Sequence, residues 1–181
     1  MVVDLSSTLG RKSLVNPPVA ITAEHRLDGF DCGVPSLDDW LLRRALRNQA
    51  NGASRTFVSC EVGREYSRVV GYYALAASAV AVDAAPGRFK RNMPDPIPVV
   101  VLGRLAVARP NHGKGLGRAL FQDAARRIIR TAETVGIRGM LVHAISDEAK
   151  AFYEQLGLTA SPLDPMVLMA TVADLTEAAR I

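Results

Sequence analysis

The feature of this sequence that most constrains its fold is an apolar run that leads through three glycines into a long amphipathic helix. The run Val99–Val107 has a single charged side chain and predicts a buried strand. Gly113, Gly115 and Gly117 follow at alternate positions. Apolar residues then recur at spacings of three and four from Leu116 to about Val135, which predicts a helix. A strand, a tight turn and a helix in this order favour a parallel βαβ crossover.

Further elements are expected on both sides of this unit. Before it the sequence predicts a strand at Val19–Thr22, a helix opened by a capping box at Ser36 and ended at Asn51–Gly52, a hairpin of Arg55–Val62 and Arg68–Val80 with its turn at 63–67, and a loop at Pro86–Pro98. After it the sequence predicts a helix end with Gly136 at C′, a strand at Met140–Ala144, a helix at Asp147–Leu156 ended by Gly157, and a strand at Met166–Thr171. The hairpin is antiparallel and the crossover parallel, so we expect an α/β fold with a mixed central sheet flanked by helices. Residues 1–17 are expected to be a loose lead-in and residues 18–181 a single domain.

Composition places the chain in the globular class. Of its 181 residues, 49% are hydrophobic and 22% charged, which excludes a disordered or fibrous chain. No apolar run approaches about 20 residues, and the first fourteen residues lack the apolar core of a secretory signal. Two cysteines, Cys32 and Cys60, are too few for a metal framework and favour a reducing compartment. We therefore expect a cytoplasmic protein with no membrane association and no metal.

The positive charge is concentrated in the middle of the chain. The net charge is +4, but residues 41–130 alone carry +11 and the two flanking blocks are acidic. All the basic residues of that block except Lys90 and Lys114 are arginines, whose planar guanidinium suits bidentate phosphate contact. The block predicts anionic ligands, phosphates above all. A genome of high GC content, which encodes arginine in place of lysine on protein surfaces generally, explains the same composition equally well.

The glycine-rich turn is suited to a pyrophosphate. Glycines let the backbone turn tightly and let a phosphate approach the N–H groups. The helix N-terminus adds unpaired donors and a positive dipole end, while Lys114 and Arg118 add counter-charge. The spacing fits neither a Walker P-loop nor a dinucleotide-binding fingerprint. The alternative is a turn that merely joins strand to helix.

The same stretch resembles the GNAT N-acetyltransferases. Leu105-Ala-Val107 at the strand end, the Gly-x-Gly-x-Gly loop, and a short helix with Phe152-Tyr153 before Gly157 match that family's acetyl-CoA core. His112 stands where the family usually has Gln or Arg, and Ser146 where it often has Asn. The resemblance implies the GNAT fold, acetyl-CoA as co-substrate and Tyr153 as catalytic residue. The implied acetyl-CoA-binding residues are Leu105, Ala106, Val107, His112, Gly113, Lys114, Gly115, Leu116, Gly117, Arg118 and Ser146.

A narrower resemblance extends over most of the chain from residue 26. The segments that carry it are Phe30–Leu42, Ser54–Thr56, Val70–Tyr73, Pro96–Pro98, Leu102–Val107 and Val142–Ala144. They are similar to the GNAT toxins of toxin–antitoxin pairs. The resemblance implies acetylation of the α-amino group of aminoacyl-tRNA, inhibition of translation, a ribbon-helix-helix antitoxin and a homodimer.

Acetyl transfer needs a proton for the departing thiolate, and Tyr153 is the candidate donor. A phenol near pKa 10 and a thiol near 8.5 lie close enough for useful proton transfer. The alternative is a core tyrosine packed beside Phe152. No carboxylate pair or suitably placed histidine suggests a general base, and His143, among apolar neighbours, is expected to be structural.

The candidate RNA contacts are basic residues of the central block. They are Arg43, Arg44, Arg47, Arg55, Arg88, Lys90 and Arg91. Each alone is more typical of a solvated surface, whereas the set favours nucleic acid. Two other functions stay open: a GNAT enzyme acting on a small amine or a protein N-terminus, and a non-catalytic binding module with this fold.

Overall fold

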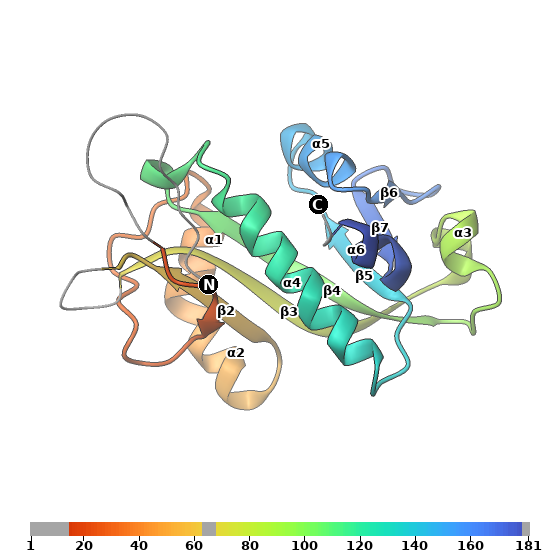
Figure 1. The fold of residues 1–181 in the computed structure, drawn as a ribbon, viewed down its shortest axis with the longest axis horizontal. Coiled ribbons are helices and arrows are strands. Elements are labelled where there is room, and N and C mark those ends of the chain that lie inside the picture. The colour runs from red at the N-terminus through yellow and green to blue at the C-terminus, as the bar shows by residue number, and fades with distance from the viewer. Residues whose placement is uncertain (1–14, 63–67, 179–181) are drawn as a thin grey trace. The chain divides into compact units, whose positions relative to one another are not determined.

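The computed structural model describes residues 15–62 and 68–178 and contains a mixed sheet with helices around it (Figure 1). Its seven strands follow the order β1-β2-β3-β4-β5-β7-β6. β4 and β5 are parallel, whereas β1–β2, β5–β7 and β6–β7 are antiparallel. The predicted α/β fold with a mixed sheet is therefore confirmed. The predicted lead-in up to residue 14 and the predicted turn at 63–67 lie outside the described residues.

The elements have the following bounds. The strands are β1 Val19–Ala20, β2 Arg55–Cys60, β3 Val69–Val80, β4 Ile97–Val107, β5 Gly139–His143, β6 Thr159–Ala160 and β7 Val167–Thr171. The α-helices are α1 Pro35–Trp40, α2 Leu46–Asn51, α3 Gly87–Lys90, α4 Leu116–Ala132, α5 Asp147–Gln155 and α6 Val172–Ala178. A π-helical segment, Leu41–Ala45, joins α1 to α2, and short 3₁₀ turns lie at Val82–Ala84 and Arg109–Asn111. In the described part of the chain, no helix is both long and apolar enough to cross a membrane.

The chain folds as two compact units. Unit 1 comprises Met1–Ala74 and Arg104–Phe121, and unit 2 comprises Leu75–Gly103 and Gln122–Ile181. The core of unit 1 includes Phe30, Leu41, Val58, Cys60 and Tyr72. The core of unit 2 includes Phe89, Ile97, Val99, Leu141 and Met169.

The first helix of unit 1 begins differently from the prediction. Its N-cap is Val34, whose side chain makes no capping bond, and Pro35 takes the first helical position. The capping box at Ser36 is therefore wrong. The helix ends as expected at Gly52, which has φ +76°. Leu46 is 36% exposed, because the π-helical turn before it rotates the residues that follow.

A close packing contact positions the start of α4 in unit 1. A Cβ atom at Gly71 of β3 would lie 3.0 Å from Leu120 Cδ1 and 3.1 Å from Leu116 Cδ2. These distances are shorter than ordinary carbon–carbon contacts. The absence of a side chain at Gly71 thus lets the first turns of α4 lie against β3.

In unit 2, α4 ends at Ala132, three residues before the expected end. The Thr131 and Thr134 hydroxyls donate to the carbonyl groups of Arg127 and Thr131, at 2.9 and 3.2 Å. Such local side-chain bonds compete with helical ones and favour an end of the helix. Gly136 lies beyond the helix without a positive φ, so its predicted C′ role is wrong.

Three elements of unit 2 were not predicted. α3 is a single helical turn inside the predicted loop 86–98, and β6 is a two-residue strand. α6 begins at a capping box that the sequence contains: the Asp174 N–H donates to Thr171 Oγ1 at 3.1 Å, and Asp174 Oδ2 accepts from the Thr171 N–H at 2.9 Å.

Candidate active site

The last residues of β4 lie beyond the part of that strand that pairs with β5. The parallel register runs from Val100–Met140 to Leu102–Val142, whereas β4 continues to Val107. Leu105 and Val107 are half-buried and Ala106 is buried. Beyond β4, the Ala108 N–H donates to the carbonyl of Val70 at 2.8 Å. The strand end that the resemblance assigns to the pantetheine arm is thus an anchored piece of backbone in unit 1.

The glycine-rich turn between β4 and α4 is exposed and has left-handed backbone at two positions. Gly113 has φ +71° and Gly115 has φ +80°, values that side-chain-bearing residues rarely adopt. A Cβ atom at either position would meet nothing within 4 Å, so open space lies above the backbone here. Because the first N–H groups of a helix have no partner within it, the turn and α4 together offer donors and a positive dipole end to an anion. These residues fit a pyrophosphate.

His112 is tied to the end of β4. Its Nε2 atom lies 2.6 Å from the carbonyl oxygen of Val107. A carbonyl oxygen only accepts, so Nε2 carries the hydrogen of this bond. His112 therefore links the start of the glycine turn to the strand, and its other ring nitrogen, Nδ1, is not used in this bond.

Ser146 and Tyr153 belong to the start and the last turns of α5 in unit 2. Ser146 is the N-cap of α5, and its Oγ atom accepts the Ala149 N–H at 3.1 Å. The pKa of the Glu148 carboxyl is lowered by its hydrogen bond from the Glu148 backbone N–H and, secondly, by one from the Ser146 hydroxyl. The structure thus gives Ser146 a helix-capping role at the start of α5.

Tyr153 is buried, with its ring packed edge-on against that of Phe152 at 5.2 Å between centroids. Burial raises the pKa of its phenol to about 12. The phenol therefore stays protonated at neutral pH, as a proton donor must, but it is a weaker acid than an ordinary phenol of pKa about 10. Tyr72 of unit 1, also buried, has its pKa raised by burial too, and its hydroxyl donates to the Leu37 carbonyl at 2.8 Å.

The seven candidate RNA contacts divide between the two units. In unit 1, the Nε atom of Arg43 forms an ion pair with Oδ1 of Asp39 at 3.4 Å. The Nη1 atom of Arg55 donates to the carbonyl of Gln49 at 3.0 Å. Arg44 and Arg47 are exposed, and within the described residues neither side chain has a hydrogen-bond or ion-pair partner.

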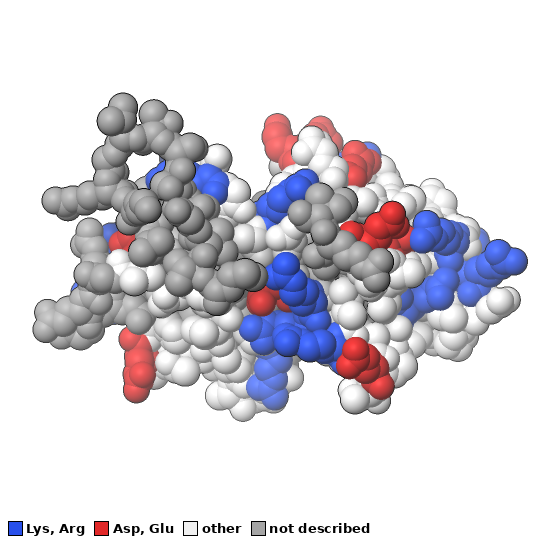
Figure 2. Space-filling model, in the orientation of Figure 1, with Lys and Arg blue, Asp and Glu red and all other residues white. Residues whose placement is uncertain are grey.

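In unit 2, the candidates Arg88, Lys90 and Arg91 lie on and directly after α3. Arg88 is ion-paired with Asp174. Arg91 is exposed and Lys90 half-buried, and no ion pair to either is found among residues 15–62 and 68–178. On the face drawn in Figure 2, basic side chains form several separate groups with acidic ones between them.

Sequence reasoning missed an aromatic stack beside β4 in unit 1. The Arg104 guanidinium carbon lies 5.5 Å from the centre of the Trp40 ring. That ring is stacked on Tyr72 at 5.9 Å, with 6° between the ring planes. A cation over an aromatic face is held in place. The signal was weak because these residues belong to three distant segments.

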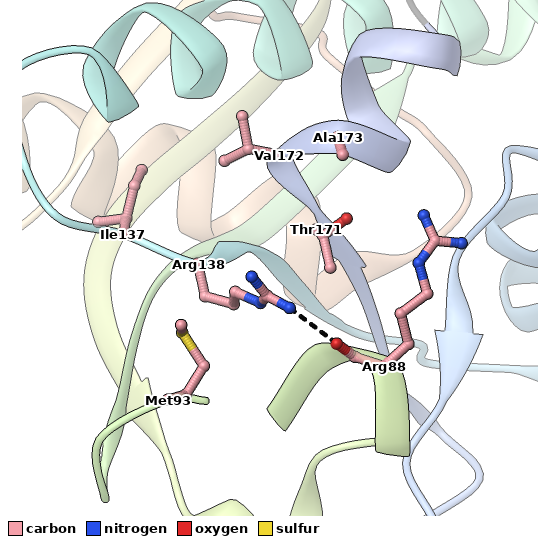
Figure 3. A pocket seen from close by; sticks show the side chains of 7 residues that line it. All are labelled: Arg88, Met93, Ile137, Arg138, Thr171, Val172 and Ala173. Atoms are coloured by element: carbon pink, nitrogen blue, oxygen red, sulfur yellow. Dashed lines mark hydrogen bonds between the residues drawn. The ribbon is translucent and has the colours of Figure 1, made fainter. Parts of the chain in front are cut away.

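Sequence reasoning also missed a pocket of about 270 Å³ in unit 2 (Figure 3). It is lined by Arg88, Met93, Ile137, Arg138, Thr171, Val172 and Ala173. At one side of it, Arg138 donates from Nη2 to the carbonyl of Arg88 and from Nε to that of Phe89, both at 2.7 Å. Arg138 stands alone before β5 in the sequence, so no periodicity or motif marked it.

His143, expected to be structural, is exposed at the end of β5, and Cys32 is buried in the core of unit 1. Both cysteines are free, and within the described residues no group of three or more metal-ligating side chains gathers.

The family is decided by the order of these elements together with the match of the sequence. A model of the acetyltransferase (GNAT) family matches residues 22–158. The chain belongs to the GNAT family. That assignment confirms the resemblance drawn from the glycine turn and the Phe152-Tyr153 helix.

Similar GNAT proteins include toxins. The chain is 49% identical over 157 residues to a tRNA-acetylating toxin of Mycobacterium tuberculosis (strain ATCC 25618 / H37Rv), covering 87% of this chain and 92% of that protein. Among solved structures, AtaT complexed with acetyl-methionyl-tRNAfMet has a TM-score of 0.83 at 28% identity, covering 90% of this chain and 98% of the other. A mutant AtaT toxin bound to the C-terminus of the antitoxin AtaR and acetyl-CoA has a TM-score of 0.76 at 28% identity, covering 90% and 96%.

Proposed function

We propose that this GNAT protein is a toxin that transfers the acetyl group of acetyl-CoA to the α-amino group of aminoacyl-tRNA and so inhibits translation. The observation that carries the proposal is the 49% identity to a tRNA-acetylating toxin over nearly the whole chain. The geometry agrees, because the exposed turn with left-handed Gly113 and Gly115 leads into the N-terminus of a 17-residue helix, where a pyrophosphate can be held.

The roles of the residues follow from the chemistry of the transfer. Acetyl-CoA, when bound, supplies an activated acyl group whose carbon the amine attacks. The turn from His112 to Arg118 holds the pyrophosphate, and the N–H groups of Leu105–Val107 orient the acyl arm. Tyr153 donates a proton to the departing thiolate. Its pKa near 12 makes it a weak acid, but burial also raises the pKa of a departing thiol, which narrows the pKa difference between donor and acceptor.

The substrate amine needs no dedicated base in this scheme. The α-amine of an aminoacyl ester has a lower pKa than a lysine amine because the neighbouring ester withdraws electrons. A large part of it is therefore neutral near pH 7.5 and ready to attack. The scheme fits a chain in which no carboxylate pair suggests a base.

The partners extend the same proposal. We infer that a cognate antitoxin of the ribbon-helix-helix type neutralises the protein, since a relative of similar fold is bound to the C-terminus of its antitoxin. We also infer a homodimer that acts in the cytoplasm, where charged tRNA is found. Of the seven candidate RNA contacts, those whose side chains have no hydrogen-bond or ion-pair partner among the described residues are Arg44 and Arg47 in unit 1, and Lys90 and Arg91 in unit 2.

The experiment that tests the function is acetyl transfer from radiolabelled acetyl-CoA to three acceptors. These are charged tRNA, the same tRNA without its amino acid, and a mixture of small amines and peptides. We expect label only on the charged tRNA, released with the amino acid when the ester is hydrolysed. Label on small amines or peptides alone would favour the other type of GNAT enzyme, and no transfer to any acceptor would favour a binding module. Expression of the chain alone should also stop growth of the host.

A further inference from the structure

α3 of unit 2 is too short to be stable alone. It has four residues, Gly87–Lys90, and a single helical turn does not repay the cost of nucleation. Its carbonyl groups have no partners within a helix of this length. Something outside the helix must therefore hold it.

Arg138 supplies that hold at the C-terminal end of α3. Its guanidinium donates to the carbonyl of Arg88 at 2.7 Å (Figure 3) and to that of Phe89, also at 2.7 Å. A cation that binds the last carbonyls of a helix satisfies them and complements the negative end of its dipole. Because the two bonds come from one rigid fork, they fix the direction of the helix as well as its place.

A second contact ties α3 to the junction of β7 and α6. The Arg88 side chain pairs with Asp174, whose Oδ2 atom also accepts the N–H of Thr171 at 2.9 Å. The Asp174 side chain is only 22% exposed, and its Oδ2 atom also accepts the Thr171 hydroxyl at 2.6 Å, so contacts other than the ion pair hold it as well. We name Arg88, Arg138, Thr171 and Asp174 the α3 clamp. Arg88 thus has a partner within the protein, unlike a free RNA contact.

The clamp and the core together set where the next two residues point. Phe89 is 2% exposed and packs in the core of unit 2, so α3 is held from within as well. Arg91 follows directly and is exposed, and Asn92 has φ +58°, a left-handed conformation that Asn adopts more readily than most residues. Lys90 and Arg91 therefore lie directly after backbone that the clamp and the core hold, and the Met93 N–H donates to the Lys90 carbonyl at 3.1 Å.

We propose that the α3 clamp positions Lys90 and Arg91 for contact with the phosphate backbone of the tRNA substrate, which makes Arg138 and Asp174 positioning residues for RNA binding. The inference rests on the proposed function, because it concerns the same substrate. Preorganised cations lose less conformational entropy on binding than cations on a loose loop.

The test uses two variants of the clamp, one that keeps the positive charge of Arg138 and one that removes the negative charge of Asp174. Arg138→Lys keeps the positive charge but cannot make both bonds with one planar fork, and Asp174→Asn removes the ion pair with little change in size. We expect either change to weaken aminoacyl-tRNA binding about tenfold and to raise the KM for aminoacyl-tRNA. The KM for acetyl-CoA and the kcat at saturating tRNA should stay as in the parent. Arg130→Lys, an exposed arginine of α4, is the matched control and should bind like the parent.

Coupling separates positioning from a general structural effect. Lys90→Ala/Arg91→Ala should reduce the salt slope of tRNA binding by about one unit for each lost phosphate contact. In that background Arg138→Lys should weaken binding no further. Additive losses, an equal rise in the KM for acetyl-CoA, or tRNA binding that ignores all these changes would overturn the inference. A further possible result is that the parent protein acetylates charged tRNA while the Lys90→Ala/Arg91→Ala variant binds tRNA as tightly as the parent. That result would overturn the inference and leave the proposed function standing.

Discussion

The ring of His112 donates from Nε2 to the carbonyl oxygen of Val107 across 2.6 Å, joining the end of β4 to the first residue of the glycine turn. GNAT sequences usually have Gln or Arg at this position, and both carry side-chain N–H donors. His112 supplies the same kind of donor. The bond closes the turn before Gly113 and so helps to fix the N–H groups that follow it.

Replacing His112 should therefore weaken acetyl-CoA binding moderately. His112→Ala removes the bond, and a single hydrogen bond contributes about 1 kcal/mol, or roughly a fivefold change in Kd. His112→Gln keeps a donor and should bind nearly as the parent does. Calorimetric titration with acetyl-CoA measures the difference. Equal weakening by both variants would show that the ring contacts the phosphates itself.

A carboxylate in the glycine turn should abolish acetyl-CoA binding. Gly115→Glu forces a side chain into backbone of φ +80° and puts a negative charge where the pyrophosphate is expected. Gly136→Glu is the control, since it makes the same change of charge on exposed backbone without a positive φ. Titration calorimetry of both proteins should show loss of binding only in the first. Parent-like affinity in a folded Gly115→Glu protein would remove the turn from the site.

Much of the fold could be predicted because its main signals are local. The apolar run to Val107, the stripe of α4 and the left-handed glycines at 52 and 157 are patterns of neighbouring residues. α6 could have been found too, since Thr171 and Asp174 have the spacing of a capping box. The π-helical turn at Leu41–Ala45 could not, because it reflects packing and not a local preference.

The site was predictable only where one motif covers it. The glycine turn and the Phe152-Tyr153 helix are continuous in sequence, and the family match includes both. The α3 clamp unites Arg88, Arg138 and Asp174 from three segments, and only folding brings them together. Partners of this kind, such as Asp174 for Arg88, also decide which arginines remain free for a ligand, and charge counting along the chain does not detect them.

A side chain at Gly71 should destabilise the protein and disturb the turn. In Gly71→Val the added Cβ would lie within 3.1 Å of Leu116 and Leu120, and overpacking of this kind costs about 1–3 kcal/mol. Gly103→Val in β4 is the control, because a Cβ there meets nothing within 4 Å. Urea denaturation should show a lower free energy of unfolding for the Gly71 variant only. Since α4 begins at Leu116, acetyl-CoA binding should weaken with it.

The two buried thiols should make the protein less stable in alkali. Burial raises the pKa of Cys32 and of Cys60 to about 11, from an ordinary value of 9.0. Between these values the unfolded chain has lost thiol protons that the folded chain keeps, so the free energy of unfolding falls as pH rises from about 9 to about 11. Urea denaturation at a series of pH values measures the slope. Cys60→Val should make it shallower, and an unchanged slope would contradict the assignment.

Removing the hydroxyl of Tyr153 should stop acetyl transfer without unfolding the protein. Tyr153→Phe keeps the ring that packs against Phe152, and it deletes the proton donor. Loss of a positioned general acid typically costs about 10²–10⁴ in rate. Because burial raises the pKa of the Tyr153 phenol to about 12, the parent should not lose activity through ionisation of this phenol up to about pH 10.

Rates on charged tRNA are to be compared between Tyr153→Phe and the parent at equal acetyl-CoA occupancy. Tyr73→Phe is the matched control, because it deletes the hydroxyl of another buried tyrosine outside the proposed site and should keep parent turnover. A Tyr153→Phe protein that binds acetyl-CoA normally but no longer arrests growth would support the role of the phenol. A Tyr153→Phe protein that keeps parent turnover would place the proton donor elsewhere.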